Sequence, residues 1–309
     1  MKLTVLVDSV DYVKNEVYQQ HVHAILPQYF DVTYIEYGPH TNRTDKFKGD
    51  ENVFICMKSR NLLKHVHDIK IWLGDRKPIV QDYDPWVFYD DTSPYKGGYD
   101  AIAEKLKEFT LFVPSQYWSS ITKTKSGIDA RPFKLGIPPD KCEVNFWQCK
   151  ANDIIFRGSS YPSRERSFAK LSQQIPVVWK RDVIRPHSAF VSYLRDVKIW
   201  AQDESDPIVI DGIEHSRNWL WPKAIEVLSM GCFLIRNFQE ESLFYEIDKM
   251  PTAFLYNDVK ETPDILNMIS AMSVEEKNQR IVDAVNFIKK QDYYVKYVCA
   301  VKDAFNEKR

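Results

Sequence analysis

The stretch HSRNWLWPKAIEVLSMGCFLIRN, residues 215–237, places a lysine and a glutamate on one face of a short helix. Pro222 suits the first turn and Gly231 the left-handed position after the last turn, which predicts a helix of about nine residues. Lys223 and Glu226 stand three apart near its N-terminus, so their side chains are neighbours. Glu226 can accept hydrogen bonds from two adjacent ribose hydroxyls while Lys223 meets a diphosphate. The alternative is an exposed ion pair worth roughly a few tenths of a kcal/mol.

A second candidate site lies in NDIIFRGSSYPSRERSFAKL, residues 152–171, where a strand runs into a turn of small residues and then a helix. Gly158 lets backbone come close to a ligand, and Ser159 and Ser160 offer hydroxyls. The helix that follows presents free N–H groups and a positive dipole end, to which Arg164 adds charge, so the turn suits phosphate. The alternative is a serine helix cap with solvated arginines. Neither GxGxxG nor GxxxxGKS/T occurs, which disfavours a dinucleotide site and a P-loop.

The elements that must position these segments alternate along the chain between strand-like apolar runs and helical segments. The strand-like runs are KLTVLV, FDVTYIEY, NVFICM, KPIVQDY and FTLFVPS in the first half and NDIIFRG, IPVVWK, DPIVIDG and CFLIRN in the second. This alternation predicts parallel sheets covered on both faces, so each half is interpreted as a doubly wound α/β domain. Such sheets bind ligands at the carboxyl ends of their strands. Prolines and polar residues interrupt the pattern at residues 135–153, where we expect the boundary.

Length and composition bound the class of protein. The 309 residues suit two domains, and 44% hydrophobic and 28% charged residues with a net charge of −1 indicate a soluble globular protein. No run of about 18 apolar residues occurs, and the N-terminus becomes charged too early for a signal peptide, so we expect a cytoplasmic protein. The five cysteines show no CxxC spacing, which favours free thiols over disulfides or zinc. Residues 274–305 have helical apolar spacing and are expected to form one long helix or two.

GSSYPSRER at residue 158 and WPKAIEVLSMGCFLI at residue 221 together resemble the donor half of GT-B glycosyltransferases, especially the CgeB-like enzymes and the DNA β-glucosyltransferase of T-even phages. In those proteins a Gly-Ser turn contacts the nucleotide diphosphate, and a basic residue three positions before a glutamate holds phosphate and ribose. The resemblance implies donor-binding roles for Gly158, Ser159 and Arg164 in the first element. It implies the same for Lys223 and Glu226 in the second.

The resemblance also implies an architecture and a reaction. The architecture is two Rossmann-like domains facing each other across a cleft, with an acceptor domain over residues 1–147, a donor domain over 148–285 and a C-terminal helix over 286–309 crossing back to the first domain. The donor substrate is a UDP-sugar, with no obligatory metal. The favoured acceptor is a 5-hydroxymethylpyrimidine such as hydroxymethylcytosine in double-stranded phage DNA, reached in the host cytoplasm. Likeness to CgeB-like proteins implies instead a bacterial surface glycan or spore-coat acceptor.

Two positions depart from the family pattern. The basic position, usually arginine, is Lys223 here, which gives up bidentate phosphate geometry. Asn218 stands where the first of the retaining families' paired glutamates would be, and this favours an inverting mechanism.

An inverting transfer needs a base that removes the proton from the acceptor hydroxyl. In the phage enzyme that base is an aspartate after a first-domain strand, in a setting similar to IVQDYDPWVFYDD, residues 79–91. The resemblance therefore selects Asp84 first and Asp82 second, and partial desolvation is expected to raise their pKa values. Asp8, at the end of the first strand, is a third candidate. The alternatives are a local Asp-Pro turn and the metal-binding DxD of GT-A enzymes, which two α/β halves disfavour.

Several further residues are candidates for contact with substrate. His215 and Arg217 precede the helix of Lys223 and Glu226, where they can touch the base or the sugar phosphate of the donor. Residues expected to contact a DNA backbone are Lys180, Arg181, Arg185, Arg195 and Lys198. The alternative outside the enzymes is a two-lobed small-ligand-binding protein, a class that is usually exported.

Overall fold

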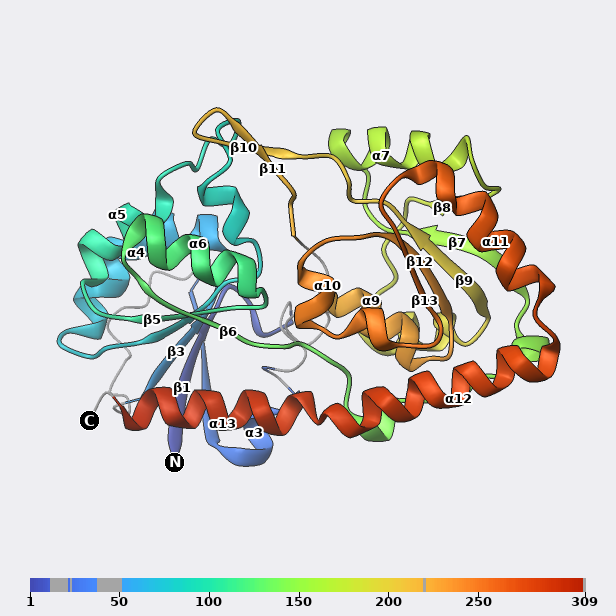
Figure 1. Cartoon of the computed structure of the whole chain (residues 1–309). Coiled ribbons are helices and arrows are strands. Elements are labelled where there is room, and N and C mark those ends of the chain that lie inside the picture. The colour runs from blue at the N-terminus through green and yellow to red at the C-terminus, as the bar shows by residue number, and fades with distance from the viewer. Residues whose placement is uncertain (12–21, 23, 38–51, 219–220, 308–309) are drawn as a thin grey trace. The chain divides into compact units, whose positions relative to one another are not determined.

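The chain divides into two units, each built on its own parallel sheet (Figure 1). The computed structural model describes residues 1–11, 22, 24–37, 52–218 and 221–307. The first unit holds Met1–Leu135, Ile208–His215 and Tyr294–Arg309, and the second holds Gly136–Pro207 and Ser216–Tyr293.

The first unit has a six-stranded sheet in the order β2-β1-β3-β4-β5-β6, with every pairing parallel. Its strands are β1 (Lys2–Val7), β2 (Asp31–Glu36), β3 (Val53–Cys56), β4 (Ile79–Gln81), β5 (Thr110–Val113) and β6 (Asp129–Pro132). The five strand-like runs predicted in the first half are confirmed as β1 to β5. The order reverses between β1 and β3, and a reversal of this kind opens a crevice at the carboxyl ends of the two strands.

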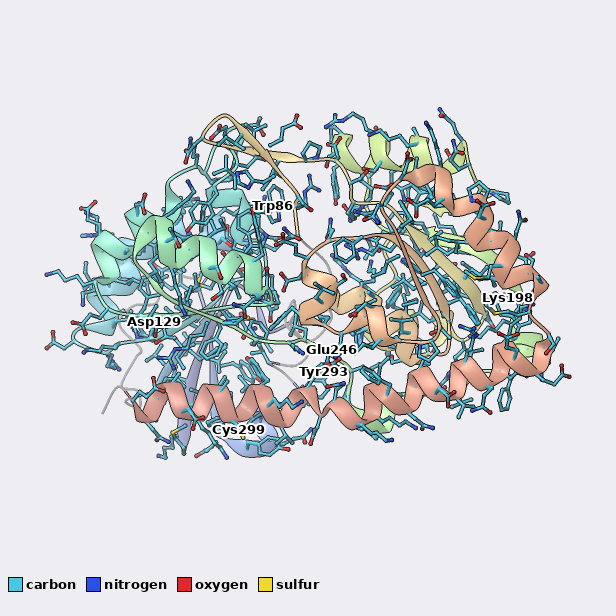
Figure 2. All side chains as sticks on the ribbon, in the orientation of Figure 1. Trp86, Asp129, Lys198, Glu246, Tyr293 and Cys299 are labelled. Atoms are coloured by element: carbon cyan, nitrogen blue, oxygen red, sulfur yellow. The ribbon has the colours of Figure 1, made fainter. Side chains whose placement is uncertain are left out.

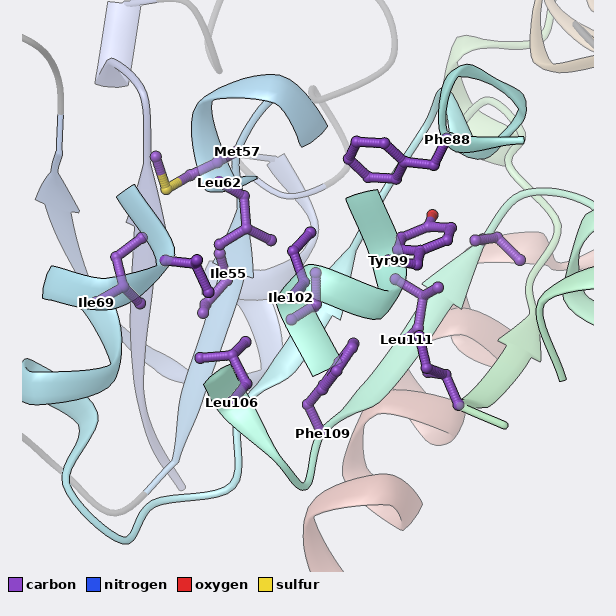
Figure 3. Close-up of a cluster of buried hydrophobic side chains, with 14 of the residues drawn as sticks. Ile55, Met57, Leu62, Ile69, Phe88, Tyr99, Ile102, Leu106, Phe109 and Leu111 are labelled. Atoms are coloured by element: carbon purple, nitrogen blue, oxygen red, sulfur yellow. The ribbon is translucent and has the colours of Figure 1, made fainter. Parts of the chain in front are cut away.

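Helices cover both faces of the first sheet. They are α3 (Leu26–Tyr29), α4 (Ser59–Leu73), α5 (Gly98–Leu106), α6 (Gln116–Ser126) and α13 (Tyr293–Asn306), with the 3-10 turn η1 (Pro85–Phe88). Leu111 and Val113 of β5 join the apolar cluster formed with α4, α5 and α6, part of which Figure 3 shows. Phe112, between them, points the other way, against Phe133, which contacts Tyr297 of α13. The prediction of a doubly wound α/β sheet is therefore confirmed for this unit.

A β-hairpin from the middle of the second half of the sequence belongs to the first unit. It consists of β10 (Ile208–Ile210) and β11 (Ile213–His215), which pair antiparallel. The prediction that DPIVIDG continues the alternation of a parallel sheet is therefore wrong. Ile208 and Ile210 are buried in the first unit's apolar cluster, and the Asp91 carboxylate accepts the N–H groups of Asp211 and Gly212 at 3.1 and 2.8 Å. Both turn residues have positive φ, as an Asp-Gly hairpin turn requires.

The second unit has a five-stranded parallel sheet in the order β13-β12-β9-β7-β8. Its strands are β7 (Asn152–Arg157), β8 (Val178–Lys180), β9 (Val197–Gln202), β12 (Phe233–Asn237) and β13 (Ala253–Tyr256). The predicted runs NDIIFRG, IPVVWK and CFLIRN are confirmed as β7, β8 and β12. The central strand β9 was not predicted. The order reverses between β7 and β9, so a crevice is expected at their carboxyl ends.

The helices of the second unit include the predicted helix of Lys223 and Glu226. They are α7 (Pro162–Ser172), α8 (His187–Leu194), α9 (Trp221–Ser229), α10 (Glu241–Phe244), α11 (Thr262–Ala271) and α12 (Val274–Gln291), with 3-10 turns η2 (Pro139–Lys141), η3 (Trp147–Cys149), η4 (Ile247–Lys249) and η5 (Val259–Glu261). The nine residues of α9 confirm the predicted length. Gly231 follows at φ 68°, and a Cβ there would lie 2.7 Å from Ile281, so both the conformation and the space require glycine.

The segments that join the units differ from the expected boundaries. The second unit begins at Gly136, ahead of residue 148, because Glu143 donates its N–H to the Ser229 carbonyl at 2.9 Å and Trp147 packs on Phe233. The C-terminal segment is two helices, since Asp292 breaks it with a left-handed φ of 48°. The return to the first unit starts at Tyr294 rather than residue 286.

Among the helices that the structure describes, none combines the length and apolar character that a membrane span needs.

Candidate functional site

Charged side chains gather at the point where the strand order of the second sheet reverses. β7 ends at Arg157 and leads through a turn that begins at Gly158 into α7. β9 ends at Gln202 and leads to Asp203 and Glu204. Because β7 and β9 are adjacent and parallel, their carboxyl ends lie at one edge of the sheet. The turn predicted to bind a ligand thus lies beside a carboxylate that the sequence analysis did not select.

Glu204 is the centre of a buried ionic cluster. The residue is 2% exposed, and its Oε1 accepts from Nε and Nη2 of Arg164 at 3.1 and 2.8 Å. Arg217 Nη1 lies 3.6 Å from Oε2, and Arg236 of β12 is fully buried beside the carboxylate. Burial alone would raise the pKa of Glu204, but the three guanidinium groups lower it below its usual value.

Arg236 stays charged inside this cluster. Burial lowers the pKa of Arg236 to about 10, against the opposing effect of the Glu204 and Asp203 carboxylates, which still leaves the group charged at neutral pH. The cluster therefore combines buried guanidinium groups and carboxylates next to the N-terminus of α7. A helix N-terminus favours an anionic ligand.

Arg164 shapes the turn after β7. Its Nη1 donates to the Ser159 carbonyl at 2.9 Å, and a Cβ on Gly158 would lie 3.1 Å from the same nitrogen. Ser159 and Ser160 are exposed, and the Ser160 hydroxyl bonds Glu165. The N-cap of α7 is Tyr161, without a side-chain cap bond. The turn is therefore held by a buried arginine rather than by a serine cap with solvated arginines.

Two further candidate residues reach the same turn. Lys223 Nζ lies 3.5 Å from the Arg157 carbonyl, and its ammonium stands over the rings of Phe190 and Trp200 at 5.3 and 5.7 Å. Arg217 donates to the Ser163 hydroxyl at 2.9 Å. The structure thus brings Lys223 and Arg217 together with Gly158, Ser159 and Arg164 around one helix beginning.

Glu226 is buried rather than exposed, and it pairs with a histidine. It is 4% exposed, and its Oε1 lies 2.8 Å from Nε2 of His187, the first residue of α8. Burial lowers the pKa of His187, but the Glu226 carboxylate outweighs that effect and leaves the pKa raised. In the described part of the chain, the buried Glu226 Oε2 has no hydrogen-bond partner. A buried acceptor left open is costly, so a ligand that donates a hydrogen bond would stabilise it.

The three candidate aspartates of the first unit have different surroundings. Asp82 is buried and accepts from the Tyr99 hydroxyl at 2.6 Å, from the Asp84 N–H at 2.9 Å and from the Ser59 hydroxyl. Asp8 accepts from the Lys58 N–H at 2.7 Å and from the Asn61 side chain at 2.8 Å, which ties β1 to the start of α4. Both carboxylates are thus occupied by bonds within the protein.

Asp84 is the accessible carboxylate of the three. Its side chain is exposed, and it precedes Trp86, which Figure 2 labels. The pKa of Asp84 is raised to about 7, first because surrounding protein atoms partly desolvate the carboxylate and second because the Asp82 carboxylate repels its negative charge. A hydrogen bond from Trp86 and the positive charges of Arg60 and Lys58 act in the opposite direction. Solvent at the exposed side chain moderates this rise. A carboxyl group that titrates near neutrality suits proton transfer.

No protein-family model and no curated protein matches the sequence. Solved structures match nearly the whole chain at 10% identity. A UDP-forming α,α-trehalose-phosphate synthase from Burkholderia xenovorans in complex with glucose-6-phosphate aligns with a TM-score of 0.63, over 98% of this chain and 100% of that one. HepE of Anabaena in complex with UDP and glucose aligns with a TM-score of 0.62, over 99% of both chains. The trehalose-6-phosphate synthase OtsA also gives 0.62, over 98% and 99%.

The chain has the GT-B fold. This confirms the expected fold class, with one Rossmann-like sheet in each unit. The finer resemblance to the CgeB-like and phage enzymes stays a prediction.

Two residues of this part of the second unit, Glu204 and His187, were not predicted from the sequence. One predicted residue, His215, belongs to the first unit. Glu204 follows the apolar run VKIWAQ, and the rule that ligands bind at strand ends would have found it. His187 follows a proline in a polar segment and has no local signal. His215 lies in β11 of the first unit, where its Nδ1 is 2.8 Å from the Tyr117 hydroxyl. It is therefore not among the residues that the second unit gathers around Gly158.

Glu204→Ala should lower the free energy of unfolding by about 3–5 kcal/mol, because it leaves buried guanidinium groups without their counter-charge. Urea unfolding followed by circular dichroism measures the change. Glu240→Ala, at an exposed glutamate before α10, is the control and should change it by less than about 0.5 kcal/mol. Equal effects of the two substitutions would show that Glu204 does not hold the cluster together.

Proposed function

We propose that this protein is a glycosyltransferase that moves a sugar from a UDP-sugar to an acceptor hydroxyl. The observation that carries the proposal is the buried Glu226 carboxylate, with one oxygen held by His187 and the other open, on the helix whose Lys223 reaches the Gly158 turn. An open carboxylate beside a cationic turn is complementary to a ribose joined to a diphosphate. Proteins of the same fold support this donor class, since HepE was solved with UDP and glucose.

Donor cleavage is assigned to the second unit. The bond between the anomeric carbon and the diphosphate oxygen breaks, and its electron pair leaves with UDP. The Lys223 ammonium and the free N–H groups at the start of α7 stabilise that charge, an electrostatic role of the oxyanion-hole kind. Arg164 acts through the turn, because its guanidinium is already bonded to Glu204 and to the Ser159 carbonyl.

Acceptor activation is assigned to Asp84 of the first unit. The acceptor oxygen attacks the anomeric carbon on the face opposite the leaving group, which inverts its configuration, and Asp84 takes the hydroxyl proton. Asp84 is preferred because its side chain is exposed, whereas Asp82 is buried and Asp8 accepts from the Lys58 N–H and the Asn61 side chain. Its raised pKa also suits a base that works near neutral pH.

For the acceptor we propose a hydroxymethylated pyrimidine in double-stranded DNA, flipped out of the stack. This choice rests on the sequence resemblance to the phage enzyme. Three of the residues expected to contact DNA are already in ion pairs: Arg195 with Glu143, Lys198, labelled in Figure 2, with Asp153, and Arg181 with Glu165 at 4.0 Å. Lys180 and Arg181 stand over the rings of Tyr193 and Trp179, at the edge strand β8 and just after it. Backbone contacts are therefore assigned to this edge.

The acceptor is identified by incubating the protein with a set of UDP-sugars and DNA containing hydroxymethylcytosine, then weighing the digested nucleosides. A mass gain of one sugar on the modified base is the expected result. DNA without the hydroxymethyl group is the matched control. UDP binding without any mass gain would reject the DNA acceptor and favour a glycan or spore-coat acceptor, while the absence of UDP binding would favour a two-lobed protein for another small ligand.

Glu226→Ala should raise the Kd for UDP about 10- to 100-fold, because hydrogen bonds to a charged group are worth about 1.5–3 kcal/mol. Calorimetric titration measures the affinity, and a rise in melting temperature with UDP checks it independently. Glu240→Ala should bind UDP as the wild type does. A Glu226→Ala protein with unchanged affinity would refute the donor site.

Asp84→Ala should abolish turnover while leaving UDP affinity unchanged. In the wild type kcat should rise with pH through about 7, because only the ionised carboxylate accepts the proton and its pKa is raised to about 7. Rates of UDP release between pH 5 and 9 measure the profile. Asp100→Ala, an exposed aspartate on α5, is the control and should keep both rate and profile. Turnover that survives in Asp84→Ala would exclude it as the base.

A further inference from the structure

We infer that His187 is a positioning residue that orients Glu226 toward the nucleotide and thereby sets the preference for ribose over deoxyribose. This inference rests on the proposed function, because it concerns the same donor site. It gives His187 of α8 a role in donor binding and adds a substrate selectivity.

The geometry brings two helix beginnings together at one edge of the sheet. His187 begins α8, which follows β8, while Glu226 lies in the second turn of α9, which leads into β12. The strands of this sheet are all parallel, so helices that follow their carboxyl ends start at the same edge. The contact of 2.8 Å between His187 Nε2 and Glu226 Oε1 joins residues 39 apart in sequence. It fixes one carboxylate oxygen in a crowded interior.

A glutamate side chain needs such a contact to present a defined oxygen. Its χ angles otherwise allow several rotamers, and choosing one costs conformational entropy at the moment of binding. With Oε1 bonded to His187, the remaining acceptor is Oε2, which is buried and has no partner in the described residues. The carboxylate oxygen available to a ligand is therefore defined before the ligand binds.

The groups around His187 favour a strong, fixed bond. Glu226 is the charged group that acts on the imidazole, and it keeps the pKa of His187 raised in spite of burial. Lys223, on the same face of α9, directs its ammonium over the rings of Phe190 and Trp200. The imidazole also lies 6.4 Å from the ring of Phe190, one turn along α8. The hydrogen bond to Glu226 and the packing near Phe190 restrict rotation of the His187 imidazole.

Selectivity follows from the single open oxygen. In this proposal the ribose 2′-hydroxyl donates to Oε2 and satisfies the buried acceptor, whereas a 2′-deoxyribose lacks that donor. A site built to bond a hydroxyl discriminates against the analogue that lacks it. Without His187, Glu226 can rotate away or bond elsewhere, so the discrimination should weaken.

The experiment compares the affinities of UDP and 2′-deoxy-UDP by calorimetric titration. The wild type should prefer UDP about 10- to 100-fold, the value expected of a hydrogen bond to a charged group. His187→Phe should weaken UDP binding by about the same 10- to 100-fold, leave deoxy-UDP binding little changed and so bring the UDP to deoxy-UDP ratio close to one. His187→Gln keeps an amide donor at the position of Nε2 and should restore most of the ratio. Ser188→Ala, at the exposed neighbour on α8, should match the wild type.

The outcomes separate this inference from the proposed function. If the wild type does not bind UDP, the proposed function and the inference both fail. If the wild type binds UDP and Glu226→Ala weakens that binding, the donor site stands; an unchanged ratio in His187→Phe then overturns the inference alone. A parallel loss of both affinities at a constant ratio would indicate a merely structural role for His187 and overturn it too. If His187→Phe does not fold, as judged by melting without nucleotide, His187→Ala carries the same expectation.

Discussion

The candidate site depends on one buried carboxylate among guanidinium groups. Removing Glu204 and its arginines from water is costly, and the arrangement is stable because each charge meets a partner. Glu204 follows β9, Arg164 belongs to α7 and Arg236 belongs to β12, so one carboxylate links two strands and a helix of the second unit. Through Arg164 the same cluster holds the Ser159 carbonyl. The position of the turn after β7 is therefore set by electrostatics inside the second unit.

In each unit, two of the carboxylates discussed above differ in how fully their hydrogen-bonding capacity is used. In the second unit Glu204 is enclosed by cations, while Glu226 keeps one oxygen without a partner among the residues described. In the first unit Asp82 accepts three hydrogen bonds, while Asp84 remains exposed with a raised pKa. A carboxylate whose bonds are complete stabilises the fold, and one with unused capacity can act on a substrate. This contrast separates the structural acids from the candidates for chemistry.

The β10–β11 hairpin shows that a sequence pattern can predict a strand without predicting the sheet that the strand joins. The run DPIVIDG has the short apolar stretch of a strand, and a strand does form there. A short apolar stretch does not say which sheet the strand joins, because it indicates only that the residues are buried. Ile208 and Ile210 find that burial in the first unit, where Asp91 holds the hairpin turn. The strand β9 was not predicted, although its apolar run VKIWAQ is followed by the turn residues DESDP.

The sequence by itself determined the local features: the strand-like runs, the nine residues of α9, the left-handed Gly231 and the small-residue turn at Gly158. These follow from backbone preferences that act over a few residues. Only the tertiary structure decided that Arg164 is buried against Glu204, that Glu226 meets His187, and that Asp84 is accessible while Asp82 is not. Those pairings join residues about 40 positions apart in sequence or depend on local crowding. The charge and bonding capacity of a side chain are set by what folding packs around it.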